Sequence, residues 1–567
     1  MMAPSRSSRC AAFIAAYSKG ASTSVDSDLS EAQARRAELL VQRSKSKTVL
    51  ALPDPVGTGK TVVALTAAAI LLEEGTVQRV LVVAPNAVVQ GLWVARAKHL
   101  NEGSLGTKPF RDVRKGQPGL RWKDGELRVV TRGALAANRK PDDSQSLVIV
   151  DEAHRGLQNR GSFYNNLDAW VADQRTFLVT ATPFQLSTSG VLTMLAVGGG
   201  KELQKSEPAI RGYGTYLVRL ARHCAVMREE GNDAGAILAD PKAQELVGKG
   251  QAAALAARDA LESFVLPPDK YVAKLPHHPK LLPLGDSSAS GAVTPTLIEL
   301  GNAGLAHHVA RTVPELVKVG KGDMFNRQIV SSSEGFWAST AGKQLKEGTD
   351  SILSEASVMP SAAKRLSEQL ETDLGNGGDH PKVKATTKWA SDRLREKRHV
   401  LVFCVFAATR QALYKALIAE LGEDRVAAPA GDKVPKTIGD RFRTEPKSPQ
   451  DALVLILQDR FSESIDLDGG KPCLVHHDLP WNPARLSQRW GRAVRASSGF
   501  QAISAQDIFV PVLDTEVDRR LYETVCGRWE VGDLLLPKKA GYDENDDGSG
   551  VIPAELLRGL AEIWHQR

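Results

Sequence analysis

Short, fully apolar runs alternate with longer helical patterns along the first part of this chain. Strands are predicted where the runs occur, at Thr48–Leu52, Arg79–Ala84, Leu127–Val130 and Leu147–Val150. Helices are predicted to begin between them, at Lys60 and Ala87. Strands that are apolar at every position and separated by helices are typical of a parallel sheet covered on both faces. The pattern therefore predicts an α/β lobe.

The same alternation returns towards the other end of the chain. A helix is predicted at Ala407–Leu421, and strands at Val400–Val405, Ala452–Leu457, Cys473–His476 and Ile508–Val512. Between the two blocks, Ala-rich helical patches such as Gln251–Val265 and Asp350–Leu374 alternate with stretches rich in Pro, Gly and Ser. The predicted fold class is α/β, with two parallel-sheet lobes and a largely helical insertion between them.

These changes in sequence pattern and composition divide the chain into five predicted segments. Residues 1–28 contain Arg6, Arg9 and Lys19 and no acid before Asp26, a composition shared with organelle transit peptides. A flexible polar tail is the preferred interpretation. The other predicted segments are a first lobe at 29–184, the insertion at 185–380, a second lobe at 381–530 and a C-terminal extension at 531–567.

Composition narrows the class of protein. Of the 567 residues, 42% are hydrophobic and 25% are charged, which is typical of a folded globular chain rather than a disordered or fibrous one. The excess of 73 Lys and Arg over 66 Asp and Glu gives a net charge of +7, which permits an anionic partner but is small for this length. We therefore do not infer nucleic-acid binding from charge alone.

Cysteine and histidine usage argues against a metal or disulfide framework. The five cysteines form no CxxC pair, and the pairs His277-His278, His307-His308 and His476-His477 are adjacent, so their side chains do not face one ligand. We interpret these histidines as surface or core residues. No apolar run is long enough to cross a bilayer, and we expect a cytoplasmic protein, associated with the nucleoid if its source is bacterial.

A glycine-rich turn lies between the first predicted strand and the helix at Lys60. Its sequence is Asp54-Pro-Val-Gly57-Thr58-Gly59-Lys60-Thr61. A strand, a loop and a helix in this order form a phosphate loop, whose backbone amides meet an anion at the positive helix N-terminus. Lys60 would reach the β and γ phosphates, and the Thr61 hydroxyl would hold Mg²⁺. The first glycine of the usual eight-residue pattern is replaced by Asp54, so the consensus is only partly met.

Two carboxylates follow the buried strand at Leu147–Val150. Asp151 and Glu152, in the run Asp-Glu-Ala-His154, stand at the carboxyl edge, where open α/β sheets bind their ligands. Asp151 would orient Mg²⁺, and Glu152 would act on the water that attacks the γ phosphate. A strand that ends in an acidic turn is common by chance. This one is informative because it is predicted to lie in the same sheet as the strand that precedes Lys60.

With these two motifs the sequence resembles the superfamily-two helicases and translocases, and further landmarks of that superfamily occur in the same order. Val80–Pro85, followed by Gln90 and Trp93, looks like the strand and loop that touch the nucleic-acid backbone. By this resemblance the remaining site residues of the first lobe are the adenine-reading Gln33, the backbone-contacting Pro85, Asn86, Thr131 and Arg132, and the coupling residues Thr180 and Thr182.

The second block carries the most specific match. The run from Asp478 to Arg495 includes Gln488, Arg492 and Arg495 and closely resembles the final motif of the Snf-like branch of superfamily two. Arg485, Arg489, Arg492 and Arg495 lie in a stretch without acids, which would be repulsive in an isolated helix unless anions neutralised it. By motif position, Arg492 and Arg495 would stabilise the charge that develops on the γ phosphate, as arginine fingers do.

The segment before it, Asp459–Leu467, resembles the preceding motif of the family. By that resemblance Ser462 and Glu463 contact nucleic acid and Asp466 takes part in coupling. Ser464 occupies the position where the family usually has glycine. The catalytic set implied is thus Lys60, Asp151, Glu152, Gln488, Arg492 and Arg495, and the ATP contacts are Gln33, Gly57, Thr58, Gly59, Lys60, Thr61 and Asp151, with Thr61 and Asp151 holding Mg²⁺.

The resemblance implies two RecA-like lobes that hydrolyse ATP and move along a nucleic acid, which we expect to be duplex DNA. We expect it to translocate along the duplex without separating the strands. Two alternatives stay open. In the first, the protein is an ATP-gated subunit of a larger defence, repair or remodelling complex, with a partner that supplies the effector activity. In the second, it is a helicase that acts on RNA.

Overall fold

The computed structural model divides the chain into two compact units. One extends to residue 277, and the other holds the described residues between 279 and 494 and between 503 and 526. The structure describes residues 5–21, 27–55, 57–104, 108–116, 121–135, 146–157, 160–172, 174–180, 188–198, 200–230, 236, 239–267, 269–274, 279, 281–282, 284, 291–299, 327–328, 330–338, 380–429, 434–458, 467, 470–480, 483–494, 503–515, 517–523 and 525–526. We treat the units separately.

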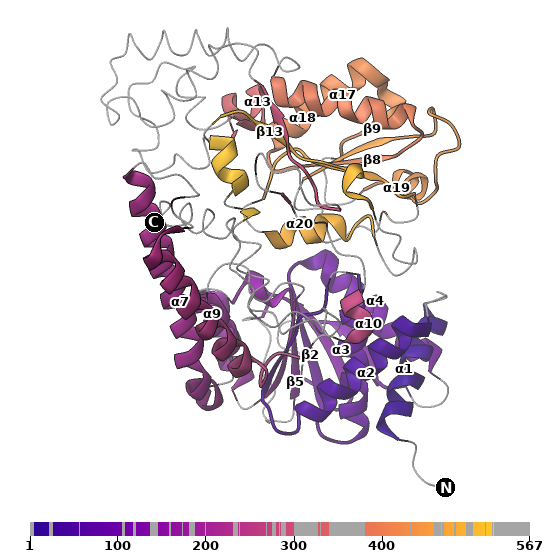
Figure 1. Ribbon diagram of the computed structural model, residues 1–567. Helices are drawn as coiled ribbons and strands as arrows, with labels where there is room; N and C mark the ends of the chain where they lie inside the picture. The colour runs from indigo at the N-terminus through magenta and orange to yellow at the C-terminus, as the bar shows by residue number, and fades with distance from the viewer. Residues whose placement is uncertain are drawn as a thin grey trace, which may run out of the picture. The chain divides into compact units, whose positions relative to one another are not determined.

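A parallel sheet of six strands forms the centre of the first unit (Figure 1). In spatial order its strands are β1 (Val49–Leu52), β6 (Arg175–Val179), β5 (Ser146–Asp151), β2 (Arg79–Ala84), β4 (Glu126–Thr131) and β3 (Asp112–Lys115). The inner strands are buried at all positions but one at the end of β2, β4 and β6, because helices cover both faces, which is why they read as apolar runs. The predicted α/β class is confirmed, and β3 and β6 are added to the predicted strands.

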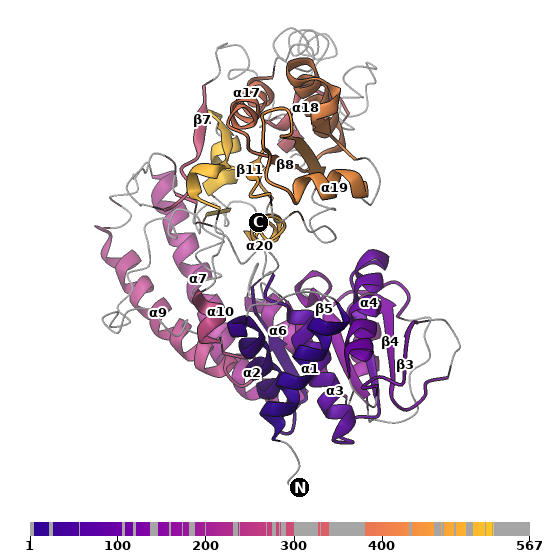
Figure 2. The same cartoon turned by 90° about the vertical axis from the view of Figure 1, so that its right-hand side faces the viewer.

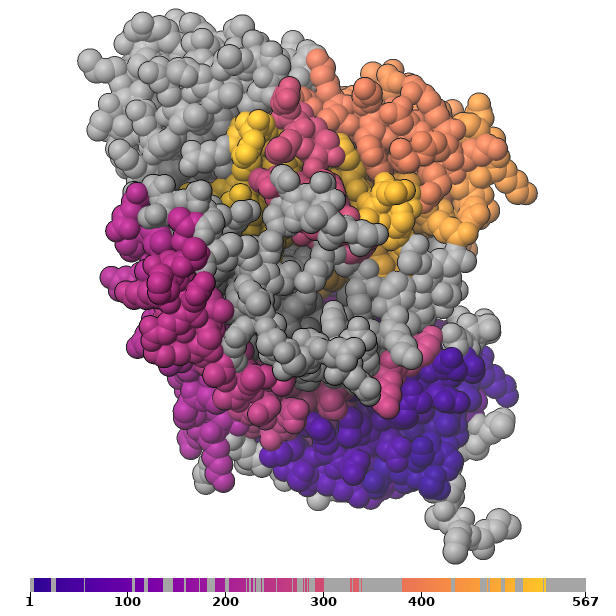
Figure 3. All heavy atoms as spheres, in the orientation of Figure 1, coloured from indigo at the N-terminus to yellow at the C-terminus, as the bar shows by residue number. Residues whose placement is uncertain are grey.

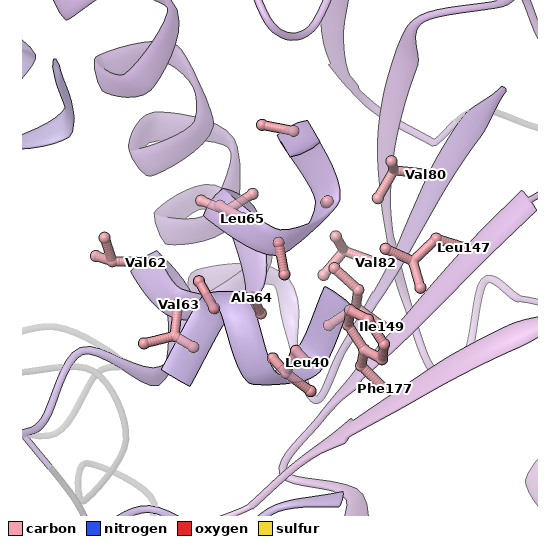
Figure 4. Close-up of a cluster of buried hydrophobic side chains, with 14 of the residues drawn as sticks. Leu40, Val62, Val63, Ala64, Leu65, Val80, Val82, Leu147, Ile149 and Phe177 are labelled. Atoms are coloured by element: carbon pink, nitrogen blue, oxygen red, sulfur yellow. The ribbon is translucent and has the colours of Figure 1, made fainter. Parts of the chain in front are cut away.

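The helices of this unit are α1 (Arg6–Gly20), α2 (Ser27–Arg43), α3 (Lys60–Glu73), α4 (Ala87–Gly103), α5 (Ser162–Val171), α6 (Thr188–Ala196), α7 (Gly200–Glu229), α9 (Pro241–Leu261) and α10 (Lys270–Lys274), with a 3₁₀ turn at Ala153–Arg155. Helices α1 to α4 pack on one face and α5, α6, α7 and α9 on the other. Figure 4 shows part of the first cluster, where α3 side chains such as Ala64 meet Val82, Ile149 and Phe177. Because α3 is enclosed on all sides, it is apolar all round.

The predicted flexible tail at residues 1–28 is wrong for Arg6–Gly20, which form helix α1. Cys10 and Ile14 are buried against the first lobe, and Arg6 and Arg9 pair with Glu74 at the end of α3. The backbones of α1 and α4 meet closely, because a Cβ added at Gly20 or Gly103 would collide with the carbonyl of His99 or Ala16. The prediction failed because this segment has few apolar residues. Its helix packs instead through the close approach of two backbones at glycines, which needs little apolar side-chain area.

The predicted separate insertion at 185–380 is divided between the two units. Helices α7 and α9 lie side by side and belong to the first unit (Figure 2). After α9 the chain runs along the free edge of β1, where Ala51 N donates to Phe264 O at 2.7 Å and Leu266 N donates to Ala51 O at 3.0 Å. The outer side of α7 is open to the surface in Figure 3, with Val218 and Val226 exposed. The predicted patch at Asp350–Leu374 lies outside the described residues.

The second unit contains a parallel sheet of five strands. Their order is β12 (Ile508–Phe509), β11 (Cys473–His476), β8 (Val400–Cys404), β10 (Val454–Gln458) and β9 (Val426–Ala427). A short parallel pair joins β13 (Pro511–Leu513) to β7 (Thr296–Ile298). The predicted strand at Ile508–Val512 is therefore two strands in two sheets, because the chain leaves the main sheet after Phe509.

The helices of the second unit are α13 (Ser333–Trp337), α17 (Pro381–Arg395), α18 (Ala407–Leu421), α19 (Lys436–Phe442) and α20 (Pro483–Trp490), with 3₁₀ turns at Glu423–Arg425 and Ala505–Asp507. Helices α17 and α18 cover a core that includes Val402, Ile456 and Val475 from three strands. Two parallel-sheet lobes are thus present, as predicted. Within the described part of the chain, no helix combines the length and hydropathy needed to cross a bilayer.

Candidate nucleotide and nucleic-acid site

The glycine-rich turn connects β1 to α3 in the first unit. Gly57 and Gly59 have φ of 87° and 80°, a region that only glycine enters without strain, and Gly59 caps α3. Lys60 Nζ donates to Pro55 O at 2.8 Å, so the ammonium lies over the loop. Amides at the start of a helix, glycines without Cβ and a lysine above them form a cradle that suits phosphate.

Gln33 is brought to this loop by helix α2. Its side chain is buried and Nε2 donates to Thr58 O at 3.0 Å. A Cβ at Gly59 would collide with the Gln33 amide, so the glycine makes room for the glutamine. The structure therefore places Gln33, Thr58 and Gly59 together, and the adenine-reading role of Gln33 stays a prediction.

Asp54 explains the departure from the usual glycine consensus. Its carboxylate accepts hydrogen bonds from Arg36 Nε, at 3.0 Å, and from Arg36 Nη2, and both side chains are almost fully buried. Arg36 also donates to Pro267 O in the segment after α9. The loop is thus tied to helix α2, one turn beyond Gln33, by a buried ion pair.

Asp151 ends strand β5 and Glu152 follows it, at the same carboxyl edge of the sheet as the glycine-rich turn after β1. Trp93 Nε1 on α4 donates to Asp151 Oδ2 at 2.7 Å. Burial, reinforced by the charge of Glu152, raises the pKa of Asp151 to about 6. A divalent cation would offset this penalty, because Asp151 and the Thr61 hydroxyl are the hard oxygen donors that Mg²⁺ prefers. The residues present therefore fit Mg²⁺.

Helix α4 reaches both predicted Mg²⁺ ligands. Trp93 holds Asp151, and one turn later Arg96 Nη1 donates to Thr61 Oγ1 at 2.9 Å. Gln90 and Trp93, which follow the segment predicted to touch nucleic acid, are both buried, and Gln90 Nε2 donates to Val129 O. Sequence reasoning missed Arg96 and the role of Trp93, since the fold that brings them to Thr61 and Asp151 is not written in a local motif.

Glu152 has an uncommon backbone conformation. Its φ of 47° and ψ of 47° are left-handed, and it is one of three described residues other than glycine with positive φ. Glu152 N donates to Asp151 Oδ1 at 3.0 Å, and His154 Nδ1 lies 3.4 Å from Glu152 Oε2. The same His154 nitrogen is 2.8 Å from Thr180 Oγ1. Thr180 therefore lies beside the acidic turn, while Thr182 lies outside the described residues.

The candidate nucleic-acid contacts of the first unit follow neighbouring strands. Strand β2 is followed by Pro85 and Asn86. Strand β4 ends at Thr131 and is followed by Arg132, and Ala84 of β2 is in register with Thr131 of β4. Asn86 Oδ1 accepts from Val88 N and Val89 N at 3.0 Å each, so its side chain caps α4. Arg132 Nη2 donates to Asp151 O at 3.0 Å and to Glu152 O at 2.6 Å. Ser462, Glu463 and Asp466 lie outside the described residues.

The arginine-rich helix of the second unit is α20. Arg489 is fully buried and donates to Asp478 O at 2.7 Å, so it supports the fold of its own lobe. Gln488 is buried, and Arg492, which follows the helix, is 6% exposed. Leu467 N donates to Arg492 O at 2.9 Å, which fixes the backbone there. Arg495 lies outside the described residues.

Residues 26–185 match the family model described as "Type III restriction enzyme, res subunit". The matched range contains the glycine-rich turn and the Asp151–Glu152 pair, so the first lobe is similar to that family. No curated protein matches the chain. The predicted resemblance to helicase-type ATPases is supported for this lobe, and its Snf-like branch stays a prediction.

Solved structures of helicase-type proteins are similar to this chain at low identity. The Sulfolobus solfataricus SWI2/SNF2 ATPase core in complex with dsDNA is 13% identical, with a TM-score of 0.32 over 89% of this chain and 92% of that chain. The Pyrococcus furiosus Hef helicase domain is 16% identical, with a TM-score of 0.40 over 86% and 96%. S. cerevisiae Dbp5 bound to RNA and ADP BeF3 is 13% identical, with a TM-score of 0.42 over 94% and 93%. TM-scores this low assign no substrate to this chain.

Proposed function

We propose that this protein is an ATP-dependent motor of the superfamily-two helicase type, which couples ATP hydrolysis to movement on duplex DNA. The observation that carries the proposal is the meeting of two motifs at one sheet edge. The phosphate cradle follows β1 and the Asp151–Glu152 pair follows β5, with β6 alone between these strands. Nucleotide hydrolysis needs both a phosphate site and a carboxylate for the attacking water.

The proposed roles follow from the chemistry of each side chain. Lys60 and the amides of the glycine-rich turn bind the phosphates, Gln33 contacts adenine, and Glu152 accepts the proton of the attacking water. Thr61 and Asp151 would hold Mg²⁺, which neutralises phosphate charge when it is bound. Arg492, in the second unit, and Arg495 carry the proposed role of stabilising the charge that develops on the γ phosphate.

Duplex DNA is proposed as the track because the run from Asp478 to Arg495 resembles the Snf-like branch most closely. Pro85, Asn86, Thr131 and Arg132 would contact phosphates rather than base edges, so binding would be insensitive to sequence and weakened by salt. The matched family is named for one subunit of a restriction enzyme. That name favours a partner protein with the effector activity as the second candidate.

Steady-state ATPase rates test the proposal. They are measured without nucleic acid and with single-stranded DNA, duplex DNA or duplex RNA, and Lys60→Ala is the control for contaminating ATPases. We expect stimulation by duplex DNA, followed by ATP-dependent displacement of a triplex-forming strand without separation of the duplex. Stimulation by RNA alone selects an RNA helicase, and activity that requires a protein partner selects the gated subunit.

Lys60→Ala and Glu152→Gln separate binding from hydrolysis. Both variants should lose turnover, but Glu152→Gln should still bind ATP, because Glu152 acts on water while Lys60 holds the phosphates. Isothermal titration with ATP distinguishes them. Undiminished hydrolysis in either variant would remove that residue from the proposed site.

A further inference from the structure

Arg132 holds the backbone of the acidic turn at both of its carboxylate residues. Its Nη2 atom donates to the carbonyls of Asp151 and Glu152, at 3.0 and 2.6 Å. Its guanidinium also lies over the Phe163 ring, 5.5 Å from the centroid. Hydrogen bonds from a charged donor are stronger than those between neutral groups. Arg132 is therefore the side chain that fixes the path of the chain through this turn.

The turn needs such support because Glu152 is left-handed. A side chain with a Cβ is disfavoured at φ 47° and ψ 47°, and it keeps this conformation only when its surroundings impose it. The Asp151 carboxylate bonds Glu152 N from one side, and Arg132 bonds Glu152 O from the other. Without Arg132, the peptide after Glu152 would rotate and carry the carboxylate away from its present direction.

Arg132 also belongs to the segment proposed to grip a nucleic-acid backbone. It follows Thr131 directly, and Arg132 N donates to Ala84 O at 3.1 Å, beside Pro85 and Asn86. Its Nε atom is buried without a hydrogen-bond partner, so one donor of the fork is unused. A phosphate held at this edge would attract the guanidinium, and any shift of Arg132 would be transmitted to the Glu152 carbonyl.

We propose that Arg132 is a positioning residue that sets the orientation of Glu152, and that nucleic acid acts on ATP hydrolysis through it. This inference rests on the proposed function, because it assigns the route by which the track regulates the same site. In this role Arg132 bonds neither the ATP phosphates nor the attacking water. It acts on the main chain that carries Glu152.

The experiment compares Arg132→Met with Arg128→Met in the full chain. Arg128 lies on β4, the strand that Arg132 follows, is fully buried and pairs with Glu126, away from the acidic turn. Each protein is assayed below its melting temperature for kcat and for the Kd of ATP. Arg132→Met should lower unstimulated kcat by roughly 10- to 100-fold, the cost of a small misplacement of a reacting group, and change the Kd by less than about 3-fold. Arg128→Met should melt at a lower temperature and keep its kcat.

The second readout is the ratio of kcat with and without the nucleic acid that stimulates the wild type. This ratio should fall to about one in Arg132→Met, and Arg132→Lys should recover part of both kcat and the ratio, because an ammonium still donates to the two carbonyls. Unchanged kcat in Arg132→Met, or equal losses in Arg128→Met, overturns the positioning role. A reduced kcat with an intact ratio overturns the coupling. If no nucleic acid stimulates the wild type, the motor proposal fails, while the kcat comparison still tests Arg132.

Discussion

At the scale of single residues, Asp54 replaces a consensus glycine without loss of the phosphate loop. The loop needs glycine where φ is positive, at Gly57 and Gly59, whereas Asp54 is needed as the partner of Arg36. A buried arginine without its carboxylate retains an uncompensated charge. The pair therefore joins the helix that carries Gln33 to the loop that carries Lys60.

Restoring the consensus with Asp54→Gly should destabilise the protein. Removal of one member of a buried pair costs about 3–5 kcal/mol, because the other charge stays buried. The double variant Asp54→Gly/Arg36→Met should recover a large part of this loss.

Urea unfolding measures the free energy of unfolding of each variant. Asp124→Gly, which removes the exposed partner of Arg79, is the matched control and should cost no more than about 1 kcal/mol. Equal stabilities of Asp54→Gly and Asp124→Gly would contradict the role of the pair.

His477 links three segments of the second unit in its neutral form. Its Nδ1 lies 2.8 Å from Thr386 Oγ1 and its Nε2 lies 2.9 Å from Ser331 O. Burial lowers the pKa of His477 below its usual 6.5, and nearby Lys382 lowers it further, against the opposing effects of Asp478, Asp518 and the Ser331 carbonyl. The histidine pair at 476–477, predicted as surface or core, is in the core.

The second unit should therefore lose stability as the pH falls below about 6.5. The unfolded chain binds a proton there that folded His477 does not bind, and one such group changes stability by up to about 1.4 kcal/mol per pH unit. Chemical unfolding at pH 7.5 and 5.5 should show a smaller pH dependence for His477→Gln than for the wild type. Thr386→Val removes one hydrogen bond but keeps the titrating group, so its pH dependence should stay as in the wild type. An unchanged slope in His477→Gln would contradict this assignment.

At the scale of elements, the packing of α1 depends on two glycines rather than on a broad apolar stripe. Gly20 and Gly103 let the two helix backbones approach, and the arginines of α1 bond to Glu74, the C-cap residue of α3. Helix α3 begins at Lys60 and α4 carries Trp93 and Arg96. Helix α1 thus supports the two helices that serve the nucleotide site.

Gly103→Ala should destabilise the first unit by about 1–3 kcal/mol, the usual cost of overpacking, because the new methyl meets the Ala16 carbonyl. Gly91→Ala, in the same helix, meets open space and should stabilise by about 0.5–1 kcal/mol through helix propensity. Thermal melting of the two variants compares these effects. A similar shift in both would mean that α1 does not dock closely on α4.

At the scale of the whole molecule, the proposed ATPase draws on both compact units. The first unit holds the phosphate loop and the acidic turn, and the second holds Arg492 after α20. Arg485 lies on the same helix and is half-buried. Arg489, on that helix, supports the fold of its own lobe, and Arg492 and Arg495, later in the sequence, are the proposed fingers.

Arg492→Ala and Arg495→Ala should each lower the rate of hydrolysis by roughly 10³-fold, the scale measured for arginine fingers, with little change in ATP affinity. Arg485→Ala, on the helix α20 that precedes these two residues, is the control and should keep near-normal turnover. Single-turnover hydrolysis and nucleotide titration give the two quantities. Near-normal hydrolysis in both finger variants, with unchanged melting, would exclude this role.

The sequence by itself determined the features that depend on local pattern. The strand Arg79–Ala84, the helices at Ala87 and Ala407, and the turn at Gly57–Thr61 follow from apolar runs and glycine positions, which neighbouring residues decide. The carboxyl-edge placement of Asp151 follows from a buried strand that ends in acids. These features predicted two parallel-sheet lobes and the nucleotide site.

Only the tertiary structure decided which distant side chains support that site. Trp93 and Arg96 reach Asp151 and Thr61 because the sheet order places α4 near both, and Arg36 meets Asp54 because α2 crosses the start of the loop. Arg132, after β4, reaches the Glu152 carbonyl, after β5, past the one strand β2 that lies between them. No local pattern encodes these contacts, because each joins segments that become neighbours only when the strands assemble.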